Sequence, residues 1–467
     1  MNFAKNLENF GDNIALQFED GTTNSYLDLA TIADDILTLE NAPEQRTKAL
    51  VAIECENGLP VIAGYLSVLR NDFPTILVDN KLDDGLRNRL YKHYNISHVW
   101  KAHGSWEKLT NTPPTVHPDV AIMLSTSGST GTPKLVKLTK SNLQANADSI
   151  CEYLAITQDE RPITTLPIHY SYGLSVLNTH LNVGATILVT NEPITSRNFW
   201  ELFKNYNATS FAGVPTNYAM LKQLRFERME LPSLRTMTQA GGRLAPDMIQ
   251  WFAKLSIEKS RQFFVMYGQT EATARISYVP FQRLLEKIGS IGTSIPMGEL
   301  YIIDEYGAKI TESNKSGELC YKGANVMMGY AETPDDLALP DTLNGVLHTG
   351  DLAYRDDDGF YYIAGRLKRF IKIFGNRVSL DEIEYQLHED GYHATVTGQD
   401  DLLVIAVVKV YSSSKMEDQL KQHITSRYHF HHSAIRIISV DSIPLSSAGK
   451  IQYATLLEIA LQTLSGK

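Results

Sequence analysis

Short hydrophobic runs alternate with longer amphipathic stretches along the chain. The runs at 49–53 and 185–189 are apolar and rich in β-branched residues, as in buried strands, whereas residues 249–257 repeat their apolar positions at helical spacing. Such alternation predicts an α/β fold in which mostly parallel strands are covered by helices. The sequence has no repeat of fixed period, so we expect compact domains.

The pattern changes near residue 366, where we expect a domain boundary. A Gly/Asp-rich segment leads to Gly365-Arg366, and the basic stretch Leu367-Lys368-Arg369 follows. A chain of 467 residues also exceeds the length at which one hydrophobic core stops growing. We therefore predict a large N-terminal multi-layer α/β domain (1–366), a hinge (367–369) and a small mobile C-terminal α+β lid domain (370–467).

The region beyond the predicted hinge carries its own strand and helix signals. Residues 402–410 form an apolar run typical of a buried strand, and residues 381–388 have the pattern of a helix. Lys450 follows on a Ser/Gly-rich loop near the end of the chain. These signals predict a compact α+β module.

Composition and charge exclude several classes of protein. The formal net charge is −10 and no Lys/Arg-dense run is present, which argues against nucleic-acid binding. The three cysteines lack any CxxC spacing and suit free thiols in a reducing compartment. The first residues lack a signal pattern, and no apolar run approaches the length of a membrane span, so the expected location is the cytoplasm.

The sharpest local feature is a loop rich in Ser, Thr and Gly that follows the apolar run at 120–124. Its glycines let backbone N–H groups point into one concavity, its hydroxyls add donors, and its lysine brings a positive charge to a polyphosphate. The spacing differs from the GxxxxGK[ST] loop of other nucleotide-binding proteins. A solvated surface loop is the alternative. The candidate ATP-binding residues are Thr126, Ser127, Gly128, Ser129, Thr130, Gly131 and Lys134.

This loop resembles the signature of the adenylate-forming (AMP-binding) superfamily, which includes acyl-CoA synthetases, luciferases and adenylation domains. Further segments that resemble the family follow in the same order, and they are closest to acyl-CoA synthetases. The resemblance implies an active site in the cleft between the large domain and the lid. The matching segments are Met266–Glu271, Gly317–Tyr330, His348–Asp351, Gly365–Glu384 and Ser447–Ile451.

The resemblance implies catalytic roles for a few of these residues. Lys450 would bridge the substrate carboxylate and the α-phosphate of ATP, Thr270 would donate to the same phosphate, and Glu271 would hold Mg²⁺. These cations and dipoles would offset the repulsion between two approaching anions. Lys368 matches the family pivot and would be the hinge residue, with an ordinary surface cation as the alternative.

Other segments are implied to bind the nucleoside. Asp351 would accept hydrogen bonds from the ribose hydroxyls with Arg366 nearby, Tyr267 would stack on adenine, and Gly241-Gly242 would let the backbone lie against the base. Gly268 and Gln269 belong to the same ATP-binding segment as Tyr267. Taken alone, Asp351 could instead cap a turn and Tyr267 could lie in the core.

Residues 166–173 resemble the LPxxHxxG segment of aryl- and fatty-acyl ligases. No aspartate that could pair with a substrate ammonium occurs between Leu166 and Leu181, which favours a simple carboxylic acid over an amino acid. The resemblance places His169 near the carboxylate end of the acid pocket, with a satisfied core or loop histidine as the alternative. Tyr172, Phe211 and Val214 are candidate walls.

The resemblance has two departures. Leu135 stands where the family usually has glycine, and Tyr453 stands where acyl-CoA ligases often have a basic residue. Neither removes a predicted catalytic group, but the second weakens the case for CoA as the acceptor.

The predicted function is ATP-dependent activation of a carboxylic acid to an acyl-adenylate, with release of pyrophosphate and acyl transfer to a thiol. CoA is the favoured acceptor. One alternative is a stand-alone adenylation enzyme that loads an acid or amino acid onto the phosphopantetheine of a carrier protein in trans. A luciferase-like oxygenase and a non-catalytic ATP sensor are others. The expected cofactors are ATP, Mg²⁺ and the thiol.

Overall fold

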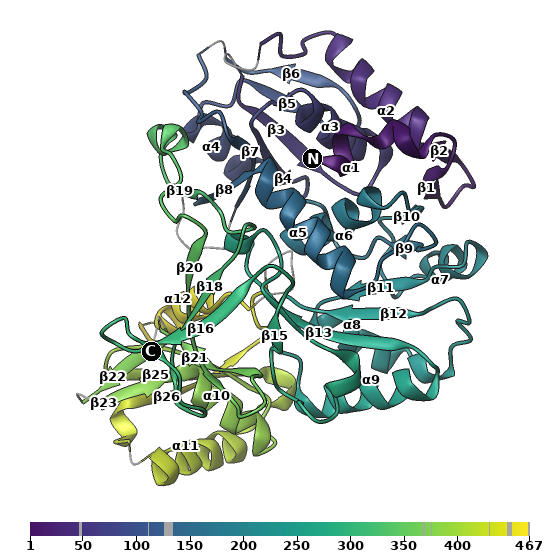
Figure 1. Cartoon of the computed structure of the whole chain (residues 1–467). Coiled ribbons are helices and arrows are strands. Elements are labelled where there is room, and N and C mark those ends of the chain that lie inside the picture. Colours follow the sequence, from purple (N-terminus) through teal and green to yellow (C-terminus); the bar gives the residue numbers. More distant parts are fainter. Residues whose placement is uncertain are drawn as a thin grey trace. The chain divides into compact units, whose positions relative to one another are not determined.

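The chain forms two compact units in the computed structural model, which describes residues 1–45, 49–110, 112–125, 134–367, 369–374, 376–428, 430–445 and 451–465 (Figure 1). Unit 1 comprises Met1–Leu300 and Tyr321–Leu347, and unit 2 comprises Tyr301–Cys320 and His348–Lys467. This mixed α/β architecture with a separate C-terminal unit agrees with the predicted fold class. The boundary after Arg366 and the hinge stay predictions, since Lys368 lies outside the described residues.

Unit 1 contains two large sheets, with strand orders β15-β14-β13-β12-β11-β9-β10-β1-β2 and β19-β8-β7-β4-β3-β5-β6. The inner strands run parallel and the outer strands pair antiparallel. The first sheet consists of β1 (Ile14–Phe18), β2 (Thr23–Ser25), β9 (Pro162–Ile163), β10 (Ile187–Val189), β11 (Ser210–Gly213), β12 (Thr236–Gln239), β13 (Gln262–Tyr267), β14 (Ser277–Val279) and β15 (Thr293–Ser294). The second consists of β3 (Val51–Cys55), β4 (Thr75–Asp79), β5 (His98–Trp100), β6 (Trp106–Lys108), β7 (Val120–Ser125), β8 (Leu135–Thr139) and β19 (Gly329–Ala331).

Helices of unit 1 cover both sheets, and two of them lie between the sheets. The helices are α1 (Asn2–Lys5), α2 (Tyr26–Asp35), α3 (Leu59–Arg70), α4 (Asp84–His93), α5 (Lys140–Tyr153), α6 (Ser171–Asn182), α7 (Arg197–Asn205), α8 (Pro215–Gln223) and α9 (Pro246–Glu258). Figure 1 shows α5 and α6 in this position. One buried cluster joins them to strands of both sheets, and it includes Leu143, Leu177, Leu124 and Val189. Burial of apolar surface on both sides of α5 and α6 therefore stabilises the layered packing.

The elements predicted in unit 1 are present with small shifts at their ends. The run at 49–53 corresponds to β3, which begins two residues later at Val51 and is buried along its whole length. The apolar stripe at 249–257 corresponds to α9, which begins at Pro246. Proline suits the first turn of a helix because its missing N–H would have no partner there.

Unit 2 contains most of a five-stranded sheet of order β17-β16-β18-β20-β21 and two smaller sheets, β22-β23 and β24-β25-β26. Its strands are β16 (Glu299–Ile303), β17 (Lys309–Ile310), β18 (Gly317–Lys322), β20 (Val346–Arg355), β21 (Tyr361–Arg366), β22 (Phe370–Ile373), β23 (Asn376–Ser379), β24 (Ala394–Gln399), β25 (Leu402–Val408) and β26 (Ile435–Val440). Its helices are α10 (Leu380–Glu389), α11 (Ser414–Tyr428) and α12 (Tyr453–Ser465).

The two elements predicted at the C-terminal end are both present in unit 2. Strand β25 is almost wholly buried but ends at Val408, because residues 409–411 form a 3-10 turn. Helix α10 begins after Ser379, whose hydroxyl accepts a hydrogen bond of 3.2 Å from the backbone N–H of Glu382. A serine in this position satisfies an N–H group that the helix itself leaves without a partner.

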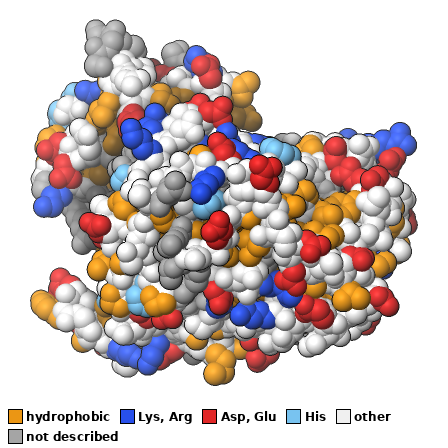
Figure 2. Space-filling model, turned by 90° about the horizontal axis from the view of Figure 1, so that it is seen from above, with side chains coloured by type: hydrophobic (Ala, Val, Ile, Leu, Met, Phe, Trp, Pro, Cys, Tyr) orange, Lys and Arg blue, Asp and Glu red, His pale blue; other side chains and the backbone are white. Residues whose placement is uncertain are grey.

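Surface charge is mixed on the face drawn in Figure 2. Lys and Arg side chains lie among Asp and Glu side chains there, and the described residues of this face form no continuous basic stripe. Within the described parts of the chain, none of the helices combines the length and apolar character needed to cross a membrane.

Candidate active site

A tight turn at the end of β13 presents the Thr-Glu pair of the predicted site. Strand β13 ends at Tyr267, and the short 3-10 helix η5 (Thr270–Ala272) follows. A Cβ atom at Gly268 would lie 1.9 Å from the carbonyl oxygen of Ala274, so only glycine fits. The amide of Gln269 donates a hydrogen bond of 3.1 Å to the Tyr267 hydroxyl. Thr270 and Glu271 therefore lie just beyond the carboxyl end of a parallel strand, where open α/β sheets bind ligands.

Distant segments of unit 1 hold Glu271 in place. The hydroxyl of Tyr330, in β19, donates a hydrogen bond of 2.8 Å to Oε1 of Glu271. The backbone N–H of Met327 donates to the carbonyl oxygen of Glu271 at 2.9 Å. Burial and the Glu271 carboxylate raise the pKa of Tyr330, so its hydroxyl stays protonated and can donate.

Thr270 lies beside the N-terminus of α6. Its hydroxyl oxygen is 3.3 Å from that of Ser171, the first residue of this helix. Unpaired N–H groups and the helix dipole give a helix N-terminus partial positive charge. An anion bound at Thr270 would therefore be stabilised.

Lys134 contacts the same tyrosine that holds Glu271. Its Nζ atom lies 3.6 Å from the centroid of the Tyr330 ring and 2.8 Å from Oε1 of Glu332. Sequence reasoning placed Tyr330 in a matching segment but gave it no role. In the sequence, Tyr330 is recognisable only as the last residue of that segment. Its position in the segment does not show which side chains the tyrosine contacts.

Most of the predicted phosphate loop lies outside the described residues, namely Thr126, Ser127, Gly128, Ser129, Thr130 and Gly131. The strands on either side of it are described. Ser125 pairs with Leu135 across the antiparallel β7 and β8, so the two ends of this segment are fixed next to each other. Leu135 has no exposed surface and belongs to a buried cluster, so this departure from the family is a core residue.

Gly241 and Gly242 follow β12, and close contacts surround the first of them. Gly241 has a φ of +85°, and a Cβ atom there would lie 2.3 Å from the hydroxyl oxygen of Tyr170. The Gln239 amide donates a hydrogen bond of 2.9 Å to the carbonyl oxygen of Gly242. This segment therefore keeps its backbone in a conformation that a side chain would disfavour.

His169 is partly buried, with 13% of its side chain exposed, and neither of its buried ring nitrogens has a hydrogen-bond partner among the described residues. Its Nε2 atom lies 3.6 Å from Oδ2 of Asp79. Burial lowers the pKa of His169, and the Asp79 carboxylate opposes this shift only in part. The ring is therefore neutral at pH 7, and its nitrogens remain available to another group.

Asp351 and Arg366 lie together in unit 2. They are register partners in the antiparallel pair β20 and β21, and Nε of Arg366 donates a hydrogen bond of 3.1 Å to Oδ1 of Asp351. The Asp351 carboxylate is almost fully buried, whereas the Arg366 side chain is mostly exposed. The guanidinium supplies a counter-charge for the buried carboxylate, whose oxygens can accept hydrogen bonds. Lys368 and Lys450 lie outside the described residues.

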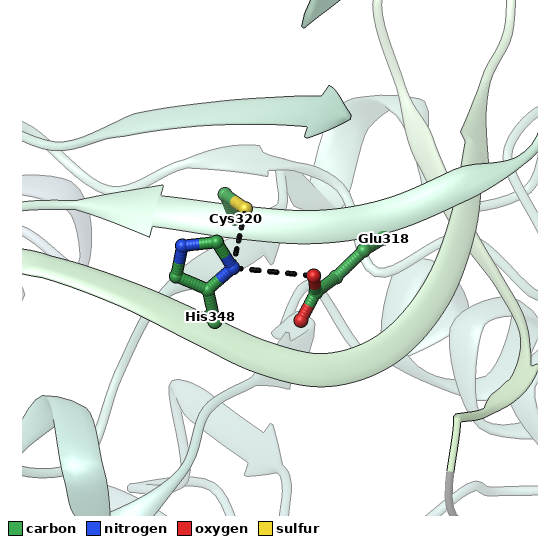
Figure 3. Close-up of side chains that lie close together, drawn as sticks. All are labelled: Glu318, Cys320 and His348. Carbon is green, nitrogen blue, oxygen red and sulfur yellow. Dashed lines mark hydrogen bonds and ion pairs between the residues drawn. The ribbon is translucent and has the colours of Figure 1, made fainter. Parts of the chain in front are cut away.

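Glu318, Cys320 and His348 form a separate cluster in unit 2 (Figure 3). Nδ1 of His348 lies 3.2 Å from Oε2 of Glu318 and 3.7 Å from Sγ of Cys320. Burial and the Glu318 carboxylate raise the pKa of the Cys320 thiol to about 12. The set contains the donor types that bind Zn²⁺, but the thiol is protonated at neutral pH and a metal would have to displace that proton.

Comparison with known proteins identifies the family. A profile described as AMP-binding enzyme matches residues 88–331. An oxalate–CoA ligase from Arabidopsis thaliana is 30% identical over 72% of this chain and 67% of its own length. A 4-coumarate–CoA ligase from Narcissus pseudonarcissus is 32% identical over 72% of this chain and 64% of its own length. The chain belongs to the AMP-binding enzyme family.

The fold of this AMP-binding enzyme matches solved structures along nearly its whole length. An o-succinylbenzoate coenzyme A synthetase from Bacillus subtilis, solved with ATP and a magnesium ion, has a TM-score of 0.79 and 23% identity. The match covers 98% of this chain and 99% of that one. The predicted resemblance to acyl-CoA synthetases of the adenylate-forming superfamily and the predicted fold class are therefore confirmed. The roles of the individual site residues stay predictions.

Proposed function

We propose that this protein activates a carboxylic acid with ATP, forming an acyl-adenylate and pyrophosphate, and then transfers the acyl group to the thiol of CoA. The observation that carries the proposal is the placement of Thr270 and Glu271 on one turn, with Thr270 beside the N-terminus of α6 and Glu271 held by Tyr330. Adenylation brings two anions together, and this turn offers the hydroxyl, the helix dipole and the carboxylate for a cation that the reaction needs. Relatives that are CoA ligases support the same reaction.

The residues around Glu271 fit a magnesium ion. The Tyr330 hydroxyl donates a hydrogen bond to Oε1 of Glu271 and so fixes the plane of the carboxylate. No described residue donates a hydrogen bond to Oε2. A carboxylate oxygen is the ligand type that Mg²⁺ prefers. When bound, Mg²⁺ would neutralise charge on the phosphates. Thr270 would donate to the α-phosphate, and Lys134 would leave Glu332 to contact the polyphosphate.

The remaining roles follow the family resemblance. Asp351 would accept hydrogen bonds from the ribose, and Lys450 would bridge the carboxylate and the α-phosphate. A neutral His169 would lie against the substrate acid without adding charge, because burial keeps its pKa low. Tyr453, in place of the basic residue common in acyl-CoA ligases, favours a second candidate, in which the acceptor is a carrier-protein phosphopantetheine in trans.

The first experiment is acid-dependent exchange between ATP and pyrophosphate over a panel of fatty, aryl, hydroxy, dicarboxylic and amino acids. Exchange should occur with one class of acid and should fall at least about 100-fold in Glu271→Gln and Lys450→Ala. The matched control is Glu286→Gln, an exposed carboxylate paired only with Arg283 among the described residues, which should exchange at the wild-type rate. If none of the acids supports exchange between ATP and pyrophosphate, the proposal is wrong.

A second experiment identifies the thiol. CoA and a phosphopantetheinylated carrier protein are offered to the enzyme with the acid found in the first experiment, and the thioester is detected by mass spectrometry. We expect the CoA thioester. If the thioester forms only on the carrier protein, the acceptor is the carrier-protein phosphopantetheine and the proposal of CoA is wrong.

A further inference from the structure

A partly open, mainly apolar cavity of about 40 Å³ lies in unit 1 between α6 and α5 on one side and β9, β11 and β12 on the other. It is large enough for a group of a few atoms but not for a long chain. Its polar lining includes an arginine from the segment that follows η5. The lining residues used below are Glu160, Ser175, His180, Phe211, Thr238 and Arg275.

Arg275 is a buried cation for which the described part of the chain supplies no counter-charge. Only 3% of its surface is exposed, and its Nε atom has no hydrogen-bond partner among the described residues, although its side chain shares a hydrogen bond with the Tyr153 hydroxyl. Its guanidinium carbon lies 3.9 Å from the centroid of the Tyr172 ring. Among the residues that the structure describes, no carboxylate forms an ion pair with it. A cation–π contact recovers only part of the free energy that removing a cation from water costs.

The other ionisable groups of the cavity do not supply that charge. Glu160 is already paired, because its Oε1 atom lies 3.2 Å from Arg235 and its other oxygen accepts a hydrogen bond from the Thr209 hydroxyl. Burial lowers the pKa of His180 to about 4, so this side chain is neutral at pH 7. Arg275 is therefore the one uncompensated charge among the described lining residues.

The cavity lies close to the predicted reaction centre along α6. Ser171, whose hydroxyl is near Thr270, precedes the lining residue Ser175 by four residues. Four residues span about 6 Å of an α-helix and return to nearly the same face. Tyr172, which stacks on Arg275, donates from its hydroxyl to the carbonyl oxygen of Thr238 at 2.8 Å, so the ring is fixed between these two points.

We propose that the acid activated by this protein carries a second anionic group, and that Arg275 binds this group in the cavity beneath α6. This inference rests on the proposed function. A carboxylate there would form charge-assisted hydrogen bonds with the guanidinium and would supply the missing counter-charge. The small volume of the cavity and the Phe211 wall restrict the substrate to a short-chain dicarboxylic acid, whose other carboxylate would be adenylated at Thr270.

The test compares rates of ATP–pyrophosphate exchange for malonate, succinate and glutarate with those for propanoate, butanoate and pentanoate. The wild type should prefer one dicarboxylate over the monocarboxylate of the same length by at least about 100-fold in kcat/KM, because a site built for a polar group rejects analogues that lack it. Arg275→Met should lose this preference, and Arg275→Lys should retain part of it.

The matched control is Arg261→Met, which removes another buried arginine that lies over an aromatic ring outside the cavity. It should leave the ratio of dicarboxylate to monocarboxylate unchanged even if it lowers the amount of folded protein. Wild-type rates that are equal for the two kinds of acid would overturn the inference. So would an Arg275→Met variant that loses both activities equally.

A binding measurement separates this inference from the proposed function. Without ATP, the fitting dicarboxylate should raise the Tm of the wild type and of Arg261→Met but not that of Arg275→Met, because a ligand stabilises the state that binds it. If no acid supports exchange but this pattern of Tm shifts is seen, the anion site stands and the reaction must be revised. The absence of a shift with all three dicarboxylates overturns the anion site.

Discussion

The hydroxyl of Tyr330 lies 2.8 Å from Oε1 of Glu271, although 59 residues separate the two in the sequence. The ring of the same tyrosine lies under the Nζ atom of Lys134. One side chain therefore orients the carboxylate proposed to bind Mg²⁺ and contacts the lysine proposed to bind the phosphates.

Replacing Tyr330 by phenylalanine separates these two contacts. Tyr330→Phe keeps the ring against Lys134 but removes the hydrogen bond to Glu271, so the carboxylate loses its fixed orientation. A hydrogen bond to a charged group contributes about 1.5–3 kcal/mol. We expect the Mg²⁺ concentration for half-maximal exchange to rise about 10-fold, measured by titrating Mg²⁺ at fixed ATP. An unchanged Mg²⁺ dependence would show that Tyr330 does not position Glu271.

Asp351 should determine the recognition of the ribose. Asp351→Asn keeps the size of the side chain but removes the charge that pairs with Arg366. The loss of a charge-assisted hydrogen bond should raise the KM for ATP about 10-fold. The wild type should prefer ATP to 2′-deoxy-ATP, and the variant should discriminate less between them. If the wild type and Asp351→Asn prefer ATP over 2′-deoxy-ATP to the same extent, Asp351 does not bind the ribose.

Stability should fall as the pH is lowered because His180 is buried in its neutral form. Burial lowers its pKa from 6.5 to about 4 in the folded protein, so the unfolded chain binds a proton more readily. This contribution is complete above pH 6.5 and is lost progressively as the pH falls toward 4. Between pH 7 and pH 5 it amounts to about 2 kcal/mol.

His180→Asn should remove this part of the pH dependence. The free energy of unfolding, measured by urea titration at pH 7 and pH 5, should differ between the two pH values by about 2 kcal/mol less in the variant. His169 also has a lowered pKa and continues to contribute in the same direction. The same pH dependence in both proteins would contradict the prediction.

Tyr453 should stabilise unit 2 through Arg369. The guanidinium carbon of Arg369 lies 3.4 Å from the centroid of the Tyr453 ring, and the Tyr453 hydroxyl donates to Glu384 at 2.7 Å. Tyr453→Lys, which restores the basic residue common in the family, would place a second cation against Arg369. We expect a loss of about 2 kcal/mol, seen as a lower Tm.

Tyr453→Phe is the matched control for this prediction. It keeps the ring against Arg369 and loses one hydrogen bond, for a cost of about 1 kcal/mol. Thermal unfolding of the two variants under the same conditions compares them directly. If the lysine variant is as stable as the phenylalanine variant, the contact with Arg369 contributes little.

The strands and helices followed from local patterns, because a buried strand or an amphipathic helix shows its burial in its own residues. Strand β3 and helix α9 were predicted to within a few residues at each end. The end of β25 was predicted two residues too late, because the apolar pattern continues through Val410 while the backbone turns at 409–411. A turn of the backbone need not interrupt the pattern of side chains.

The sequence by itself determined the family, the order of its segments and the chemical types of the proposed site residues, because these depend on residues that are neighbours in the chain. Only the tertiary structure decided which side chains meet. The contact of Tyr330 with Glu271 and the burial of Arg275 against Tyr172 join segments that no local pattern connects. A buried charge without a partner becomes visible only when all of its neighbours are known, since the cost of burying it depends on every group around it.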